Sequence, residues 1–379
     1  MLSTRLRCGV AGFALAWLGP SSTVLAAQEW LFTALPYPAG GSMTLASGLN
    51  ESGQIAGTSY GASEYAVLVQ DGVVINIGSP YQSDASSINE QGQIVGSASL
   101  EPIVGPRDIG LRATLWQNGS VVNLGTLPGG GTSRATDIND VGQVVGTSMQ
   151  WDFEHAVIWH QGQITDLGAL KPRAINNAGQ VVGSIPAGFS NMTNAVVWEH
   201  YGGFSNMTHA VVWENGQLTD LGASPGAING SLANDINNVG QIVGVDHERA
   251  VLWWQGAKVE LGSLSGDSNS NALGINDLGQ VVGYSQTFAN SSDGIRAVLW
   301  QNGTVLDLNT LASVQASGWT LRSATQINDK GQIIGLGVSP SGFYQSYLLS
   351  PVPEPQTFRT ALMGLLALLW ASKVHRSQP

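Results

Sequence analysis

This chain of 379 residues has little cysteine, little charge and few basic residues. It has one cysteine, Cys8, which excludes a disulfide framework and a zinc site built on cysteines. Charged residues make up 11%, against roughly 25% in an average soluble protein, which excludes a coiled coil and a charged disordered tail. Lys and Arg number 15 against 26 Asp and Glu, so the net charge of −11 argues against a nucleic-acid partner.

Glycine and apolar residues are plentiful instead. The chain has 49 Gly and 15 Pro, which indicates many turns. Its hydrophobic content of 43% is enough for a packed core. We therefore expect a compact protein with many short segments between its two ends.

Residues 1–27 are typical of a secretory signal peptide. Arg5 and Arg7 precede a short apolar run at 8–18, and small residues follow. We expect signal peptidase to cleave after Ala26 or Ala27, which removes Cys8 with the signal. The alternative is an uncleaved anchor, although the run is shorter than the ~20 residues that a membrane span needs.

Residues 351–379, at the other end of the chain, have the features of a second targeting segment. Its parts are Val352, Pro353, Glu354 and Pro355, then an apolar run at 361–371, then Lys373 and Arg376. This order resembles the PEP-CTERM sorting signal of Gram-negative bacteria, which an exosortase recognises. The resemblance implies a membrane helix before processing and a final place at the cell surface or in the extracellular matrix. Arg359 interrupts the apolar stretch, and the tail lacks an arginine cluster, so a plain anchor or a buried helix remains an alternative.

Between these ends, one segment recurs seven times. It reads Asn-x-x-Gly-Gln followed by two apolar residues and Gly, as at 50–57. Its asparagines are Asn50, Asn89, Asn139, Asn176, Asn237, Asn276 and Asn328, about 46 residues apart on average. The Asn and Gly predict a turn before a short strand, because Asn can bond to nearby backbone and Gly accepts positive φ.

Two further segments fill each interval. One is Ala, two mostly apolar residues and Trp, then Gly three residues later, as at 156–162; the copy at 66–72 lacks the Trp. The other is a polar residue with Leu-Gly, as at 166–168. Such apolar runs bounded by Gly, Asn and Asp favour strands, so each unit has four short strands.

Four strands in about 46 residues predict a blade of a β-propeller. We expect an all-β domain over 28–350 with seven blades, six or eight being the alternatives, and no helix between the two targeting segments. The strand near Trp30 and the strand near Tyr347 share one blade that closes the ring, with three strands from the N-terminal end and one from the C-terminal end.

The repeat resembles a known family. His155-Ala156-Val157-Ile158-Trp159, then 166–168 and 175–183, are similar to the HAF repeat of bacterial extracellular proteins. The resemblance covers roughly residues 29 to 350, although no copy has Phe in the third position. It implies no catalytic residues.

One stretch departs from the period. Residues 188–199 return almost unchanged at 203–214. The interval that contains them is 15 residues longer than the average, so a tandem duplication added as a loop or hairpin explains it; a partial extra blade is the alternative.

No motif predicts a metal or a cofactor. Residues 137–142 faintly resemble a calcium loop but lack the spacing of an EF-hand, so a turn is the better interpretation. His155 and His209 occupy repeat positions, and no pair of histidines has metal-ligand spacing.

Loop length points to a ligand-binding face. Connections vary in length after the Leu-Gly strand and before the Ala-x-x-Trp strand, whereas the other two turns are uniformly short. In a four-stranded meander the two variable connections lie on one face, where we expect a ligand. Candidate residues there are Trp151, Asp152, Glu154, Asp246, Glu248 and Trp319, with Tyr284, Phe288 and Phe343 as further aromatic candidates.

These observations favour an exported, non-catalytic propeller that binds or organises extracellular material, either an exopolysaccharide matrix or a surface protein. The alternative is a glycan-active lyase or hydrolase, because a carboxylate pair beside aromatic platforms suits that chemistry.

Overall fold

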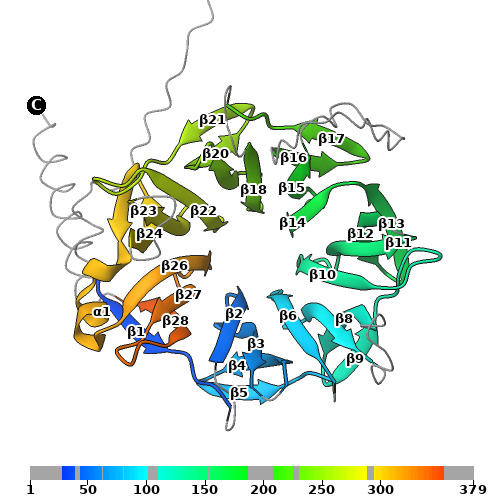
Figure 1. Cartoon of the computed structure of the whole chain (residues 1–379), viewed down its shortest axis with the longest axis horizontal. Helices are drawn as coiled ribbons and strands as arrows, with labels where there is room; N and C mark the ends of the chain where they lie inside the picture. The colour runs from blue at the N-terminus through cyan, green and yellow to red at the C-terminus, as the bar shows by residue number, and fades with distance from the viewer. Residues whose placement is uncertain are drawn as a thin grey trace, which may run out of the picture.

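The computed structural model shows a closed ring of seven four-stranded antiparallel sheets (Figure 1). It describes residues 28–38, 43–61, 63–79, 81–100, 110–151, 153–186, 208–224, 230–287 and 294–353. Seven blades confirm the predicted fold. In six sheets every strand pairs with the next one along the chain, and in the seventh the N-terminal strand is added at the outer edge, so each blade is a meander whose first strand lies innermost.

Blades are numbered here in chain order. Blade 1 holds β2 (Met43–Leu49), β3 (Ile55–Tyr60), β4 (Tyr65–Gln70) and β5 (Val73–Asn76). Blade 2 holds β6 (Ser83–Ile88), β7 (Ile94–Ser99), β8 (Leu111–Gln117) and β9 (Ser120–Asn123). Blade 3 holds β10 (Ser133–Ile138), β11 (Val144–Gln150), β12 (Phe153–His160) and β13 (Gln163–Gly168). Blade 4 holds β14 (Lys171–Ile175), β15 (Val181–Pro186), β16 (Thr208–Glu214) and β17 (Gln217–Asp220).

The remaining blades complete the ring. Blade 5 holds β18 (Ser231–Ile236), β19 (Ile242–Asp246), β20 (Arg249–Trp254) and β21 (Ala257–Glu260). Blade 6 holds β22 (Asn269–Ile275), β23 (Val281–Gln286), β24 (Ile295–Gln301) and β25 (Thr304–Asp307). Blade 7 holds β26 (Thr320–Ile327), β27 (Ile333–Val338), β28 (Tyr344–Pro351) and, from the other end of the chain, β1 (Trp30–Ala34).

Blade 7 corrects the predicted division of strands. It takes one strand from the N-terminal end and three from the C-terminal end, the reverse of the expected three and one. Trp30 pairs with Pro351 and Ala34 with Tyr347, so β1 is the outermost strand of this blade. The cause is the phase of the repeat: each blade begins at the strand that leads into Ile-Asn, and periodicity alone does not say where a unit starts.

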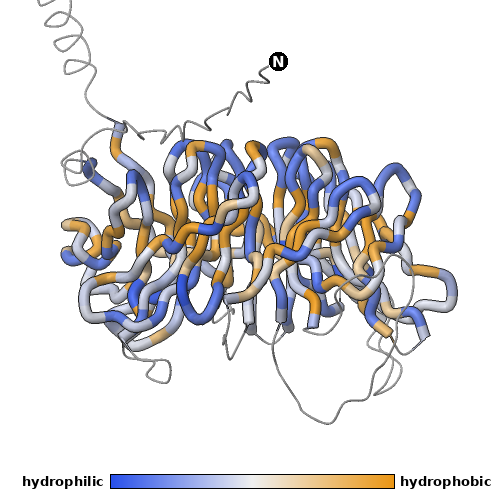
Figure 2. The backbone as a smooth tube through the Cα atoms, turned by 90° about the horizontal axis from the view of Figure 1, so that it is seen from above, coloured by the Kyte–Doolittle hydropathy of each residue, from blue (hydrophilic) through white to orange (hydrophobic). Residues whose placement is uncertain are grey.

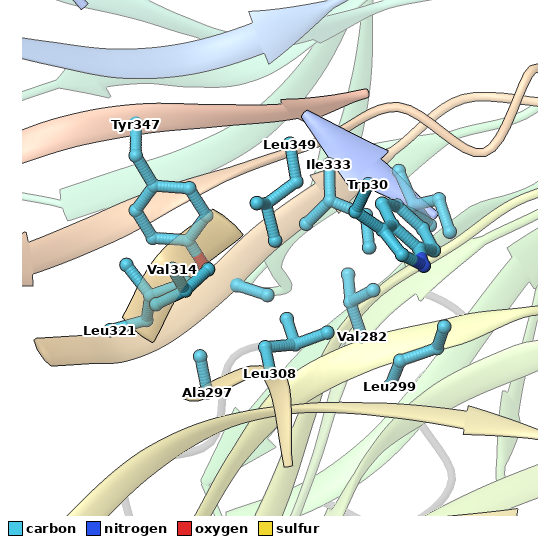
Figure 3. Packing of buried hydrophobic residues seen from close by; sticks show 12 residues of the cluster. Trp30, Val282, Ala297, Leu299, Leu308, Val314, Leu321, Ile333, Tyr347 and Leu349 are labelled. Carbon is cyan, nitrogen blue, oxygen red and sulfur yellow. The ribbon is translucent and has the colours of Figure 1, made fainter. Parts of the chain in front are cut away.

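The prediction of no helix was also wrong at one connection. A 3-10 turn, η2 (Leu308–Thr310), and one short helix, α1 (Ala312–Ser317), join β25 to β26. Val314 and Leu308 join the buried cluster around Tyr347 and Trp30, which seals blades 6 and 7 together (Figure 3). Among the described residues no helix is long and apolar enough to cross a membrane; the expected C-terminal helix lies outside them.

The seven repeat asparagines close the ring. Each side-chain amide donates from Nδ2 to the backbone oxygen of the asparagine in the next blade, as from Asn237 to Asn276 at 3.0 Å, and Asn328 returns to Asn50 at 3.0 Å. Each Nδ2 also donates to the Oε1 of its own Gln four residues later, at 2.7–2.8 Å. All seven asparagines are at most 5% exposed. The predicted turn motif is therefore also a contact between blades.

The tryptophans of the Ala-x-x-Trp segment seal the sides of the blades. Trp159 packs with Leu115 and Leu124 of the preceding blade, and Trp253 packs with Val212 and Leu221 in the same way. Apolar residues consequently concentrate at mid-height of the disc, with hydrophilic residues toward both faces (Figure 2). Each blade is thus covered on both sides by its neighbours.

Candidate functional site

The meander assigns the connections to two faces, as predicted. Turns between the first and second strands and between the third and fourth lie on one face, here called the Asn–Gln face. The other connections lie on the opposite, variable face; they range from two residues at 169–170 to 21 residues at 187–207, and the longest one that the structure describes is the helix-bearing segment at 308–319. A ligand site on loops is therefore expected on the variable face.

Most of the exposed aromatic side chains among the described residues lie on the variable face. Among the described residues, seven aromatic side chains are more than a third exposed. Six of them lie on this face: Tyr37, Tyr81, Trp151, Phe153, Phe343 and Tyr344. Only Trp254, at 39% exposure, lies on the Asn–Gln face. Flat rings that remain in solvent are suited to stack on a ligand.

Trp151 is the most exposed of them. Its side chain is 79% exposed, its φ of 57° places it at a tight bend between β11 and β12, and its indole lies over Gly129 of the neighbouring connection. Glu154 lies exposed three residues on, at the start of β12. Asp152 lies outside the described residues.

Asp246 occupies a different environment from the one expected. Its side chain is 1% exposed and accepts hydrogen bonds from Lys258 Nζ and from the Ser224 hydroxyl, the latter at 2.6 Å. Burial alone would raise the pKa of this carboxyl, but the bonds from Lys258 and Ser224 outweigh it and hold the pKa below its ordinary value. Asp246 therefore anchors blade 5 and offers no free carboxylate to a ligand.

Glu248, two residues after Asp246, lies in a different environment. It is exposed in the two-residue turn between β19 and β20, where both His247 and Glu248 have positive φ. Glu248 and Glu154 belong to blades 5 and 3, so blade 4 lies between them. The three candidate carboxylates that the structure describes, Glu154, Asp246 and Glu248, consequently do not form one cluster.

The remaining aromatic candidates divide between packing and exposure. Trp319 packs against Phe32, with ring centroids 5.2 Å apart, and supports blade 7. Tyr284 lies half-buried in β23, whereas Phe343 is 70% exposed at the β27–β28 turn. Phe288 lies outside the described residues.

The segments next to the predicted signal peptide and the predicted C-terminal sorting signal lie side by side. Val352 donates its backbone N–H to the backbone oxygen of Glu29 at 2.8 Å, so the chain enters β1 and leaves β28 side by side on the Asn–Gln face. Pro353 follows at the edge of the described range. The other named positions lie outside that range: Ala26, Ala27, Glu354, Pro355, Lys373 and Arg376.

The repeat histidines pair within their blades. His155 Nδ1 lies 3.0 Å from an oxygen of Asp166, and His209 Nδ1 lies 2.7 Å from Asp220. Arg296 makes the same contact with Asp307 at 3.4 Å. The sequence signal was available, because a basic residue stands before the Ala wherever Asp stands before Leu-Gly or Leu-Asn.

Polar contacts also explain the calcium-like stretch. Asp137 accepts from the Ser87 hydroxyl at 2.6 Å and from the backbone N–H of Ile175 at 2.9 Å, while Asp140 accepts from the backbone N–H of Glu90. These carboxylates bridge neighbouring blades. Within the described part of the chain, no group of three His, Cys, Asp or Glu side chains could hold a metal ion.

The described part of the second copy of the duplicated stretch, residues 208–214, is a regular strand. Thr208–Glu214 forms β16 and pairs directly with β15, so it supplies the third strand of blade 4. The first copy, at 188–199, lies outside the described residues. The ring has seven blades without it.

Comparison with known proteins adds the fold and nothing finer. No family model and no curated protein matches the chain. Among solved structures, it is similar to a puromycin-hydrolyzing peptidase of Mycobacterium tuberculosis, with 12% identity, a TM-score of 0.51, and coverage of 85% of this chain and 55% of that one. The β-propeller domain of the Trilobed protease from Pyrococcus furiosus matches with 10% identity, a TM-score of 0.49, and coverage of 82% and 94%. At such identities the likeness concerns the fold alone.

Proposed function

We propose that this protein is exported, sorted to the cell surface through its C-terminal segment, and binds extracellular polysaccharide through the variable face without cleaving it. The observation that carries the proposal is that six of the seven exposed aromatic side chains of the described residues lie on that face. Aromatic rings can cover the apolar faces of sugar rings, and polar loops beside them can bond to hydroxyls.

The carboxylates support binding over catalysis. Glycoside hydrolysis needs two carboxyl groups about 5 to 10 Å apart around one bond. Among the candidate carboxylates that the structure describes, Asp246 is already engaged by Lys258 and Ser224, and Glu154 and Glu248 are separated by a blade. Glycan cleavage remains the second candidate, and the experiment below distinguishes it.

The orientation of the ring fits surface display. The described chain enters and leaves on the Asn–Gln face. Attachment through the segment after Pro353 would therefore leave the variable face pointing away from the attachment point. Signal peptidase and exosortase are the processing partners that this proposal requires.

The test is light scattering of the host's own extracellular polysaccharide mixed with the purified protein. A rise in polymer mass with protein bound supports the proposal, and Trp151→Ala and Phe343→Ala should each weaken binding about tenfold. Trp254→Ala on the opposite face is the matched control and should bind as the wild type does. A fall in polymer mass would show cleavage, and an unchanged mass would direct the search to a surface protein as partner.

A further inference from the structure

The central axis of the ring carries basic side chains at one mouth. The seven inner strands surround this axis (Figure 1). Because neighbouring blades cover both sides of each sheet, an exposed residue within an inner strand reaches solvent at the axis. Arg134 of β10 and Lys171 and Arg173 of β14 are exposed in this way.

Arg134 and Lys171 lie at the variable-face ends of their strands, and Arg173 lies two residues further along β14. Strands β10 and β14 begin there and run toward Asn139 and Asn176 on the Asn–Gln face. At the opposite mouth, the residues that follow the ring asparagines include five carboxylates. They are Glu51, Glu90, Asp140, Asp277 and Asp329. The axis therefore has a basic mouth and an acidic mouth.

The fold neutralises the basic mouth only in part, through Asp84 of the inner strand β6. Lys171 and Arg173 form no ion pair with any residue that the structure describes. Arg134 lies 3.6 Å from Asp84, with its side chain 56% exposed. By contrast, Lys258 and Arg296 each pair with a carboxylate whose side chain is 1% exposed.

The ring does not need charge at these positions. Where blade 4 has Lys171 and Arg173, five and three residues before its asparagine, blade 1 has Leu45 and Ser47. Blade 5 has Leu232 and Asn234 there. Residues 27–355 hold 10 basic and 26 acidic residues, so three exposed cations at one mouth are a local exception that a ligand explains better than folding does.

We infer that this basic mouth binds the carboxylates of an acidic polysaccharide, a polymer that contains uronic acid. The inference rests on the proposed function and specifies its ligand class. Arginine matches a carboxylate with two parallel hydrogen bonds, and lysine adds a positive charge. Trp151 lies on the same face and in the same blade as Arg134, so one chain of sugars can stack on the ring and place a carboxylate at the mouth. A neutral polymer would gain only the stacking.

The test compares two polymers that differ only in charge. The purified full-length protein is titrated calorimetrically with polygalacturonate and with the same polymer after reduction of its carboxyl groups. We expect at least about tenfold tighter binding of the charged polymer at low ionic strength, with the preference declining as salt is added. Arg173→Gln should reduce that binding about tenfold and leave the neutral polymer unaffected.

The control is Lys330→Gln, an identical charge change at an exposed site on the Asn–Gln face, which should change binding less than twofold. An equal loss of affinity in both variants would show an effect of net charge and would contradict the placement of the binding site at the basic mouth. Polygalacturonate that fails to bind, or binds no better than its reduced form, overturns the inference. If the protein then still binds the host polysaccharide, the proposed function is retained. If it does not bind that polysaccharide either, the inference and the proposed function are both wrong.

Discussion

The two faces of the disc are made by the same seven blades, yet they differ in how they use the sequence. On the Asn–Gln face every blade places the same side chain in the same contact, and the seven asparagine bonds form a closed ring. On the variable face the connections differ in length and composition, and most of the exposed aromatic side chains among the described residues lie there. Closure of the fold is thus concentrated on one face, which leaves the other free to acquire a ligand.

The largest expected effect comes from opening the asparagine ring. Asn237→Ala removes the two bonds that Nδ2 donates to Asn276 and Gln241 and the two that Oδ1 accepts from the backbone of Val239 and Gln241. Because the groups left behind are buried, we expect a loss of about 2–4 kcal/mol in the free energy of unfolding. Urea denaturation followed by tryptophan fluorescence measures it.

The neighbouring residue is the matched control. Asn238 is exposed, and its Nδ2 donates to an oxygen of Asp277 in the next blade at 2.9 Å. Asn238→Ala should cost about 1 kcal/mol or less, because water can replace its partners. If both variants lost the same stability, burial of the ring would not be what matters, and the contrast between the faces would weaken.

The second largest loss of stability should come from removing a single contact on the variable face, the ion pair between Lys258 and Asp246. Lys258→Met leaves Asp246 buried with Ser224 alone, and we expect a loss of about 2–3 kcal/mol at neutral pH. Since the pKa of Asp246 is held below its ordinary value of 3.8, the wild type has this stabilisation above about pH 4 and loses it as the pH falls. The variant should therefore approach the wild type in acid, and thermal melts from pH 7 to pH 3 would reveal the convergence.

Asp235, on the inner strand of blade 5, should show the opposite pH dependence. Burial, partly offset by bonds from the backbone of Ile275 and Ile236, raises the pKa of its carboxyl from 3.8 to about 7. The folded chain then holds a proton that the unfolded chain releases, so stability falls as the pH rises from about 4 to 7. Asp235→Asn cannot ionise and should remove that fall. A melting temperature that declines equally in both proteins would assign the decline to another group.

The sequence predicted the ring because its signals are local. Turn residues and short apolar runs repeat seven times, so strand number and blade number could be counted. The division of blade 7 between the two ends of the chain could not be predicted, because a periodic pattern does not show where a unit begins. The role of Asn50 and its six equivalents was only half predicted: a turn is local, but the bond from one blade to the next requires knowing which strands are innermost.

The candidate site was predicted less well, for a related reason. Loop length identified the variable face, and the exposed Trp151 and Phe343 lie on it. Asp246 was predicted as a candidate ligand residue, but it is buried and pairs with Lys258 of another strand. Trp319 packs against Phe32, from the other end of the chain. Arg134, Lys171 and Arg173 were missed because only the ring brings their strands to one axis.

The smallest effect on stability should come from truncating the aromatic side chains of the variable face. This prediction tests most directly whether the two faces have different roles. Trp151 is 79% exposed and Phe343 is 70% exposed, so truncation to Ala removes little buried area. Each variant should change the free energy of unfolding by less than about 0.5 kcal/mol, as exposed substitutions usually do. A side chain that can be removed without cost to the fold, yet whose loss weakens polysaccharide binding about tenfold, belongs to the ligand site. A loss of stability comparable to that of Asn237→Ala would instead make these rings part of the scaffold.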